Sequence, residues 1–204
     1  MENTDTDCSF AISTKVSRHC DFPEMLILEV FAETADDIVS DAASLHAQVV
    51  FTGFGFPDMS HYHLFDCMSA HAQDACNLLV EKKHQKKIMN LMGISAYSEP
   101  PSAYILIDEI TVTKKFRGRT LALRLLREAI SVFGYGDTLV ILKAHPTSEH
   151  DVKDADIRGL ADYYLSDSQI GFKELDRDKQ LGWLIAYGAA PFYLYDSIEG
   201  PYYG

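Results

Sequence analysis

A short basic turn around Gly118 is the part of the chain best suited to bind an anion. It reads Thr113-Lys-Lys-Phe-Arg117-Gly118-Arg119 and lies between an apolar run and a helix-like run. Backbone N–H groups in the first turn of a helix have no partner within the helix, and the helix dipole favours negative charge there. Glycine lets the backbone approach a ligand closely, and a pyrophosphate suits this geometry. An ordinary solvated turn at a helix start stays open as the alternative, because short motifs often match by chance.

Two carboxylates, Asp108 and Glu109, interrupt the apolar run that precedes this turn. A charge within an apolar strand is costly unless it is paired or used, so either residue is a candidate for acid–base chemistry. Strand alternation places the two on opposite faces, and we therefore expect at most one of them to face a substrate directly. A salt bridge, or a position near a solvated strand end, is the alternative explanation.

The elements around the turn are predicted to be a strand, a helix and a second strand. Residues 104–112 and 138–142 are nearly continuous apolar runs, which are typical of parallel strands buried on both faces. Between them, apolar residues recur at three- and four-residue steps, which predicts one broad apolar face on a helix over 120–133. The residues of this face are Leu121, Ala122, Leu125, Leu126, Ala129, Ile130 and Phe133. Together these elements make a strand–helix–strand crossover.

The stretch from Ile110 to Leu126 resembles the acyl-CoA motif of the GNAT superfamily of N-acetyltransferases. The family pattern is Arg/Gln-x-x-Gly-x-Gly/Ala after a strand that ends in an apolar-x-Val sequence, and Arg117 and Ala122 fit its first and last positions. Thr120 stands where the family prefers glycine. This departure could weaken phosphate binding, or the threonine hydroxyl could replace a backbone contact.

Two later stretches also resemble the family, in the same order along the chain. Tyr163-Tyr164 followed by Gly171-Phe172 looks like the signature Tyr-Tyr-x-x-x-Gly-Phe-x-x-Leu, with a gap three residues longer. Lys143-Ala-His-Pro146 resembles the Lys-x-x-Pro found after the second strand in some members. The resemblance covers roughly residues 104–187, and the first hundred residues carry no matching motif.

The resemblance implies an α+β fold with a mixed, mostly antiparallel central sheet flanked by helices. It also implies transfer of an acetyl group from acetyl-CoA, the co-substrate, to a primary amine of a small molecule or a protein. Backbone N–H groups near Val112 would stabilise the oxygen that gains charge in the tetrahedral intermediate. The residues expected to bind acetyl-CoA are Ile110, Val112, Arg117, Gly118, Arg119, Thr120, Leu121 and Ala122.

Further roles follow from the chemistry of amide formation. An aliphatic amine is protonated at neutral pH and must lose a proton before it attacks. Glu109 and Asp108 are candidates for the base, and His145 is a third because it leaves the second strand where the acetyl group would lie. Tyr164 best matches the family acid that protonates the departing thiolate, and Tyr163 is next. A buried tyrosine that only packs its ring is the alternative.

The rest of the chain is expected to complete a single domain. Residues 1–100 form its divergent, acceptor-side half and residues 101–204 its acetyl-CoA-binding half, around one sheet. Strands over 10–18 and 25–31 are expected to form a hairpin. The other expected elements are a helix from about Asp36 to about Val50 capped by Thr34, a long helix from about 64 to 89, a helix over 154–165, strands over 172–175 and 181–187, and an edge strand over 192–195.

Composition limits the partners and the compartment. The formal charge of −12 over 204 residues disfavours nucleic acids and anionic membranes and suits amines and basic proteins, although solubility explains it as well. The polar, acidic N-terminus does not resemble a signal peptide, and no apolar run approaches transmembrane length. Four cysteines without a CxxC motif argue against a disulfide framework, so we expect a cytoplasmic protein. A homodimer that pairs its late strands stays open.

Two other functions compete with the transferase. One is a GNAT-fold protein without turnover that binds CoA or a protein partner, as Thr120 and the unmatched N-terminal half would suit. The other is a zinc protein, because His63, Cys67 and His71 fall at successive four-residue steps. A fourth ligand is not evident, although His61 is near, and we expect no metal.

Overall fold

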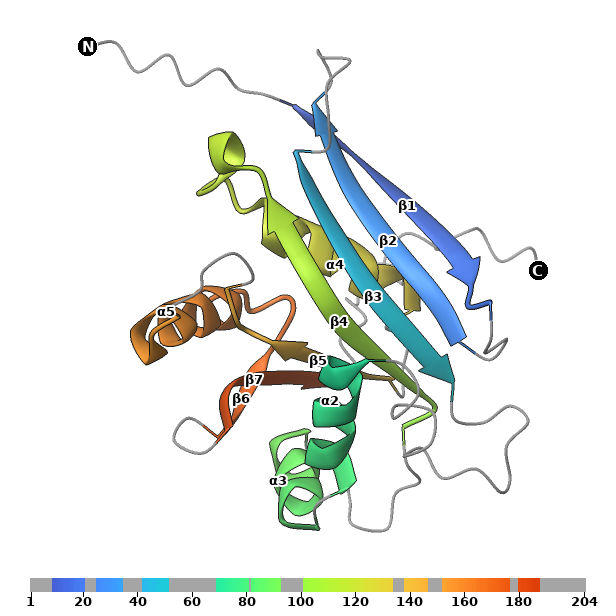
Figure 1. Cartoon of the computed structure of the whole chain (residues 1–204), viewed down its shortest axis with the longest axis vertical. Helices are drawn as coiled ribbons and strands as arrows, with labels where there is room; N and C mark the ends of the chain where they lie inside the picture. Colours follow the sequence, from blue (N-terminus) through green and yellow to red (C-terminus); the bar gives the residue numbers. More distant parts are fainter. Residues whose placement is uncertain are drawn as a thin grey trace, which may run out of the picture.

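The computed structural model describes residues 9–20, 25–34, 42–51, 69–80, 82–92, 101–133, 138–146, 152–176 and 180–187. Within these ranges the chain forms a seven-stranded sheet that has helices on both faces (Figure 1). The strands are β1 (Phe10–Arg18), β2 (Met25–Thr34), β3 (Ala43–Phe51), β4 (Ala103–Val112), β5 (Thr138–Lys143), β6 (Lys173–Asp176) and β7 (Gln180–Tyr187). The helices are α2 (Ala70–Val80), α3 (Lys82–Met92), the 3-10 turn η1 (Lys114–Phe116), α4 (Leu121–Phe133) and α5 (Asp154–Leu165).

The strands are ordered β1-β2-β3-β4-β5-β7-β6 across the sheet. Among the described strands, β4 and β5 form the one parallel pair, and the other neighbours are antiparallel. The crossover that joins β4 to β5 contains α4, as the apolar runs on either side of the basic turn predicted. The predicted fold class is confirmed: an α+β domain with a mixed, mostly antiparallel sheet flanked by helices, which is consistent with a GNAT-like fold.

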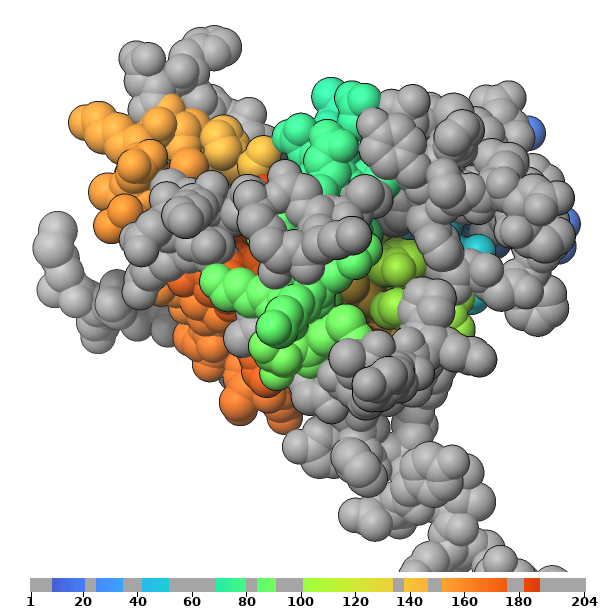
Figure 2. All heavy atoms as spheres, turned by 90° about the horizontal axis from the view of Figure 1, so that it is seen from below, coloured from blue at the N-terminus to red at the C-terminus, as the bar shows by residue number. Residues whose placement is uncertain are grey.

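The hydrophobic core has a layer on each face of the sheet. One layer packs the buried face of α4, including Leu125 and Leu126, against β2, β3 and β4, and it also includes the Tyr164 ring of α5, a helix that contacts β6 and β7. The other packs Ala72 and Ala75 of α2 and Ile88 of α3 against β4, β5 and β7. Seen from below, α2 and α3 (green) lie at the surface beside the orange residues of the late part of the chain (Figure 2).

Most of the predicted elements are confirmed. The helices expected over 120–133 and 154–165 are α4 and α5. The expected hairpin is formed by β1 and β2. The strands expected over 104–112, 138–142, 172–175 and 181–187 are β4, β5, β6 and β7, with ends that differ by a residue or a few.

The helix predicted from Asp36 to Val50 is wrong over the described part of that range, because Ala43–Phe51 is strand β3. From Ala43 to Val49 every second residue is buried and the residues between them are half-buried. This alternation is the signal of a strand with one face on the core. Residues 35–41 lie outside the described residues.

The single long helix predicted over 64–89 is also wrong, because the stretch contains two helices, α2 and α3, that pack against each other. The two helices contact different strands: α2 contacts β4, and α3 contacts β6 and β7. The first residues of the predicted helix and the edge strand expected over 192–195 lie outside the described residues. No helix in the described ranges is both long and apolar enough to cross a membrane.

Candidate functional site

Strand β4 loses one of its two neighbours halfway along its length. Its pairing with β5 runs from Ala103, opposite Thr138, to Ile107, opposite Leu142. Its pairing with β3 continues to Val112. In Figure 1 β4 and β5 diverge, with α5 on the open side. One edge of the second half of β4 therefore has no strand partner among the described residues.

The backbone of Ile110 and Val112 faces this open edge. In an antiparallel pair, the residues whose backbone groups bond to the partner alternate along the strand. The N–H of Thr113 donates to the carbonyl of Ala42 at 3.0 Å, on the β3 side. Alternation and the β3–β4 register then direct Thr111 toward β3, and Ile110 and Val112 away from it. Both residues were predicted to contact acetyl-CoA, and their backbone N–H groups have no strand partner among the described residues.

A bulge in β4 places Asp108 and Glu109 on one cavity. Glu109 pairs with His46 and Ile107 pairs with the adjacent Ala47, so Asp108 is an extra residue in β4. An extra residue resets the alternation of a strand. The expectation that the two carboxylates point to opposite sides therefore does not hold, since both line the same cavity.

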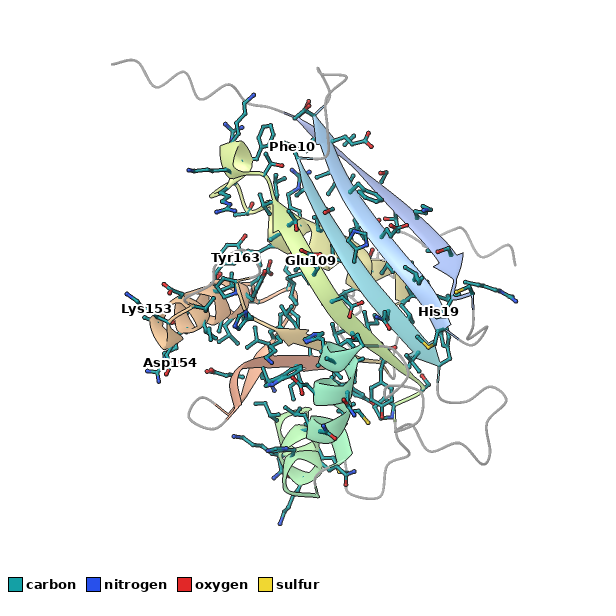
Figure 3. All side chains as sticks on the ribbon, viewed as in Figure 1. Phe10, His19, Glu109, Lys153, Asp154 and Tyr163 are labelled. Carbon is teal, nitrogen blue, oxygen red and sulfur yellow. The ribbon has the colours of Figure 1, made fainter. Side chains whose placement is uncertain are left out.

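The cavity between β4, α4 and α5 has a volume of about 650 Å³, within the range of small-ligand sites. Figure 3 shows Tyr163 on α5 and Glu109 on β4 on either side of the opening. The predicted site residues among those lining it are Asp108, Glu109, Ile110, Val112, Arg117, Gly118, Thr120, Leu121, Ala122, His145 and Tyr164, together with Tyr163. Arg119 is not among the described lining residues, and its guanidinium lies 5.9 Å from the Phe116 ring centre.

Two residues of the turn before α4, Gly118 and Thr120, have a left-handed backbone conformation. Gly118 has a φ of 81° and Thr120 a φ of 57°. The left-handed region suits glycine and is a genuine outlier for a β-branched residue. The first bond of the helix runs from the N–H of Arg124 to the carbonyl of Thr120 at 3.1 Å. Thr120 therefore keeps the conformation of a glycine, at a cost in strain.

Arg117 is exposed and reaches back over the end of β4. Its Nε donates to the carbonyl of Val112 at 3.2 Å. This contact places a guanidinium beside the open edge of β4 and at the start of the α4 turn. A doubly charged phosphate at the N-terminus of α4 would find a cation there.

The Asp108 carboxyl is held in a partly dry environment. Burial raises its pKa to about 6, which the hydrogen bond from Gln48 and the charge of His46 partly oppose. The Gln48 Nε2 donates to Oδ2 at 2.8 Å. A carboxyl that titrates near neutral pH can accept a proton from an amine and release it again.

Glu109 and His145, the other two candidates for the base, are more exposed. Glu109 accepts a hydrogen bond from the Thr111 hydroxyl at 3.3 Å. The Nδ1 of His145 lies 3.0 Å from the Pro146 carbonyl. Both residues line the cavity, but solvent competes for their charges, so Asp108 is the better placed of the three for proton transfer inside it.

The two tyrosines of α5 differ in their surroundings. Tyr164 is buried with 5 % of its surface exposed, and burial raises its pKa. Tyr163 is half-buried, and burial raises its pKa while a hydrogen bond from the backbone N–H of Leu123 opposes the shift. That N–H belongs to the first turn of α4. The Tyr163 hydroxyl therefore lies at the helix end that the basic turn leads into.

Gly182 in β7 lets α5 approach the end of β5. It has a φ of +81°, and a Cβ there would come within 2.7 Å of the Ala144 carbonyl oxygen and 2.8 Å of the Ile157 Cγ2. The Ala144 N–H also donates to the Gly182 carbonyl at 2.8 Å. This close packing fixes the wall of the cavity that carries His145 and Tyr163.

The proposed metal ligands are not brought together among the described residues. His61, His63 and Cys67 lie outside those residues. His71 stacks on Trp183, with ring centres 5.5 Å apart and planes 6° apart. Burial lowers the pKa of His71, and the charge of Lys143 adds to that effect. In the described part of the chain, no group of three or more His, Cys, Asp and Glu side chains is placed to hold a metal ion.

Sequence reasoning missed Gln48 and the α5 wall. Gln48 was predicted to lie in a helix, so the sequence could not show that it lies on β3, beside Asp108 of the adjacent strand β4. Ala155 and Gly159, one helical turn apart, line the cavity. Small residues at four-residue spacing on a predicted helix could have marked that wall.

Comparison with known proteins gives no match, whether with protein-family models, curated proteins or solved structures. The arguments for function therefore rest on the geometry of the chain itself.

Proposed function

We propose that the chain is an N-acetyltransferase that moves an acetyl group from acetyl-CoA to a primary amine of a small molecule or a protein. The observation that carries the proposal is the parting of β4 from β5 around a cavity that holds an open backbone edge, a basic helix N-terminus and a half-buried carboxyl. Each feature meets a separate requirement of the reaction. Their convergence from β4, α4 and α5 is what makes the proposal specific.

The turn and the open edge would bind acetyl-CoA. The pyrophosphate would bind the N–H groups at the start of α4, where Gly118 leaves open space above the backbone and Arg117 supplies a positive charge. The amide-containing arm of the molecule would pair with the backbone of Ile110 and Val112 as an additional strand does. The Val112 region would then lie beside the thioester, where an N–H donor can stabilise the oxyanion.

Asp108 would act as the base. An ammonium acceptor gives a proton to the Asp108 carboxylate, and the free amine attacks the thioester carbonyl. The nitrogen loses a second proton as the C–S bond breaks, and that proton restores the acid that protonates the departing thiolate. A carboxyl with a pKa of about 6 is ionised at neutral pH and is a stronger base than an ordinary aspartate.

Tyr163 is the better placed of the two tyrosines to protonate the thiolate. Both tyrosines line the cavity, but Tyr163 is only partly buried, whereas the Tyr164 ring belongs to the core. The raised pKa of Tyr163 keeps the hydroxyl in its protonated, donating form. In this proposal Tyr164 only packs its ring in the core, which was the alternative role inferred for it from the sequence.

The strain at Thr120 favours one competing function, a protein that binds CoA without turnover. A threonine that holds a φ of 57° places a side chain where the pyrophosphate would approach. Such a protein would bind acetyl-CoA and transfer no acetyl group to any amine.

Calorimetric titration with acetyl-CoA tests the proposal. The wild-type chain should show saturable binding that Arg117→Glu removes. Arg18→Glu, the same charge reversal at the far end of β1, should bind as the wild type does. Release of free thiol is then followed in a panel of primary amines. A folded wild type that does not bind acetyl-CoA contradicts the proposal, and binding without thiol release favours the non-catalytic alternative.

A further inference from the structure

A row of side chains crosses the sheet from β1 to β4 and ends beside Asp108. Lys15 is opposite Glu29, Glu29 is opposite His46, and His46 is opposite Glu109. Neighbouring strands lie about 4.8 Å apart, so directly opposite side chains can contact one another. The row ends at the bulge that carries Asp108.

Glu29 holds both of its neighbours in the row. Its Oε2 lies 2.7 Å from the Lys15 Nζ and its Oε1 lies 3.6 Å from the His46 Nδ1. The hydrogen bond from Lys15 lowers the pKa of Glu29, which keeps this carboxylate ionised. The Phe31 ring packs edge-on against the His46 ring, with centres 6.3 Å apart. His46 is therefore held in place, while 43 % of its side chain is exposed.

Acetyl transfer to an ammonium releases a proton. The reactants are the ammonium and the thioester, and the products are the amide, the neutral thiol and one proton. The amine nitrogen loses two protons in all, of which the thiolate takes up one. The other must leave the half-buried Asp108 carboxyl before the next turnover. A group that accepts protons near neutral pH and also touches water suits this step, and imidazole is such a group.

We propose that His46 is a positioning residue that passes the proton from Asp108 to solvent across the open face of β2 and β3, with Glu29 holding its ring. The inference rests on the proposed acetyl transfer and deepens it. The proton moves from the Asp108 carboxyl to the His46 imidazole and then to bulk water, so neither residue is changed after a cycle.

Other charged groups also face Asp108 or its cavity. Glu109 lies next to it on β4, Lys143 and His145 line the cavity from the end of β5, and Tyr163 lines it from α5. On α2, the His71 ring lies near the backbone carbonyl of Ile107, the residue before Asp108. The His145 Nδ1 lies 3.0 Å from the Pro146 carbonyl. His46 is opposite Glu109 at the bulge, and a positive charge on it lowers the pKa of Asp108. Because the His46 side chain is also exposed to solvent, it is the favoured relay.

His46→Gln keeps a polar side chain of similar reach and removes the titrating ring. We expect kcat at low buffer concentration to fall roughly 10-fold with little change in KM, less than the ~10²-fold or larger loss that follows removal of a base itself. Added imidazole buffer should restore the rate, because a mobile base can replace a proton relay. Glu29→Gln should show a smaller loss of the same kind. His19→Gln, at the far end of β1 (Figure 3), should match the wild type at every buffer concentration.

A second readout follows the Asp108 carboxyl by carbon-13 NMR without any turnover. In His46→Gln its titration should move to higher pH, because the positive charge that favours the carboxylate is gone. A wild type that transfers acetyl groups while His46→Gln has an unchanged rate, or a lowered rate that buffer does not restore, overturns the relay and leaves the transferase standing. A wild type that binds acetyl-CoA and acetylates no amine overturns both.

Discussion

The two halves of β4 differ in their burial and in the number of strands that pair with them. From Ala103 to Ile107 every residue is buried and the strand has a partner on each side. From Asp108 to Val112 half-buried and exposed residues alternate, and the strand pairs with β3 alone among the described strands. One continuous strand is thus a piece of the core at its start and a wall of the cavity at its end.

The difference shows how a sheet can make a binding site without losing its fold. The backbone bonds and the apolar packing of the first half fix the position of the strand. The second half then carries the groups that a core would reject, namely two carboxylates and backbone N–H groups that have no strand partner in the described part of the chain. The bulge at Asp108 marks the boundary, since the pairing with β5 ends at Ile107 and both carboxylates beyond it line the cavity.

The largest expected effect in the second half is on activity. Asp108→Asn keeps the size of the side chain and removes the base, so we expect acetyl transfer at pH 7.5 to fall by about 10² to 10⁴-fold. Because the Asp108 pKa is about 6, the wild-type rate should also fall as the pH drops through 6. Thiol-release assays across pH measure both. Glu109→Gln should have a smaller effect, and a full loss in Glu109→Gln with a small one in Asp108→Asn would reverse the assignment.

In the first half of β4, substitutions should change the free energy of unfolding through lost packing. Ile107→Ala removes a side chain that is 1 % exposed, so we expect unfolding in urea to need about 2–5 kcal/mol less free energy. Ile110→Ala, in the second half and only partly buried, should cost about 1 kcal/mol. Equal losses at the two positions would remove the distinction between the halves.

The half-buried carboxylate of Asp108 should lower the stability of the fold at neutral pH, where it would act as the base. Its folded pKa of about 6 lies above the ordinary 3.8, so the folded state holds the proton more tightly and stability falls as pH rises from about 4 to about 6. Asp108→Asn should therefore stabilise the fold by about 1–3 kcal/mol at pH 7.5, and the gain should shrink toward pH 4. Urea unfolding at both pH values tests this, and a destabilised variant at pH 7.5 would count against a costly carboxylate.

The smallest expected effect is at the turn that follows the second half. Thr120→Gly relieves the left-handed backbone of a β-branched residue, for which we expect a gain of about 1 kcal/mol in thermal or urea unfolding. Glycine also loses more entropy on folding, which limits the gain. Acetyl-CoA affinity should stay the same or rise. A marked loss of affinity would show that the Thr120 hydroxyl itself contacts the phosphates.

Sequence predicted the parts of the fold whose pattern is local. The crossover from β4 through α4 to β5 follows from the apolar runs and the spacing of residues such as Leu121 and Leu125. The Gly118 turn follows from its position at a helix start. Strand β3 was missed because Thr34 and the acidic residues that follow it suggested the start of a helix. The alternation of apolar and polar residues from Ala43 onward was a weaker signal than this cap.

The candidate site was predictable in its residues but not in its arrangement. Asp108 and Glu109 were marked by their charge within an apolar run. Their shared cavity depends on a bulge, which is a difference in register between β3 and β4 and leaves no mark in either strand. The positions of Gln48 and His46 beside Asp108 likewise depend on the pairing of β3 with β4, which are far apart in the sequence. The opening beside β4 depends on where its pairing with β5 ends.

Amide hydrogen exchange of β4, measured by NMR with and without acetyl-CoA, tests the central claim most directly. The account predicts that the N–H groups of Ile105 and Ile107 are protected throughout, and that those of Ile110 and Val112 exchange rapidly until acetyl-CoA is added and slowly afterwards. Rapid exchange at Ile110 and Val112 in the presence of saturating acetyl-CoA, or protection at both before it is added, would contradict the assignment of the open edge as the binding site.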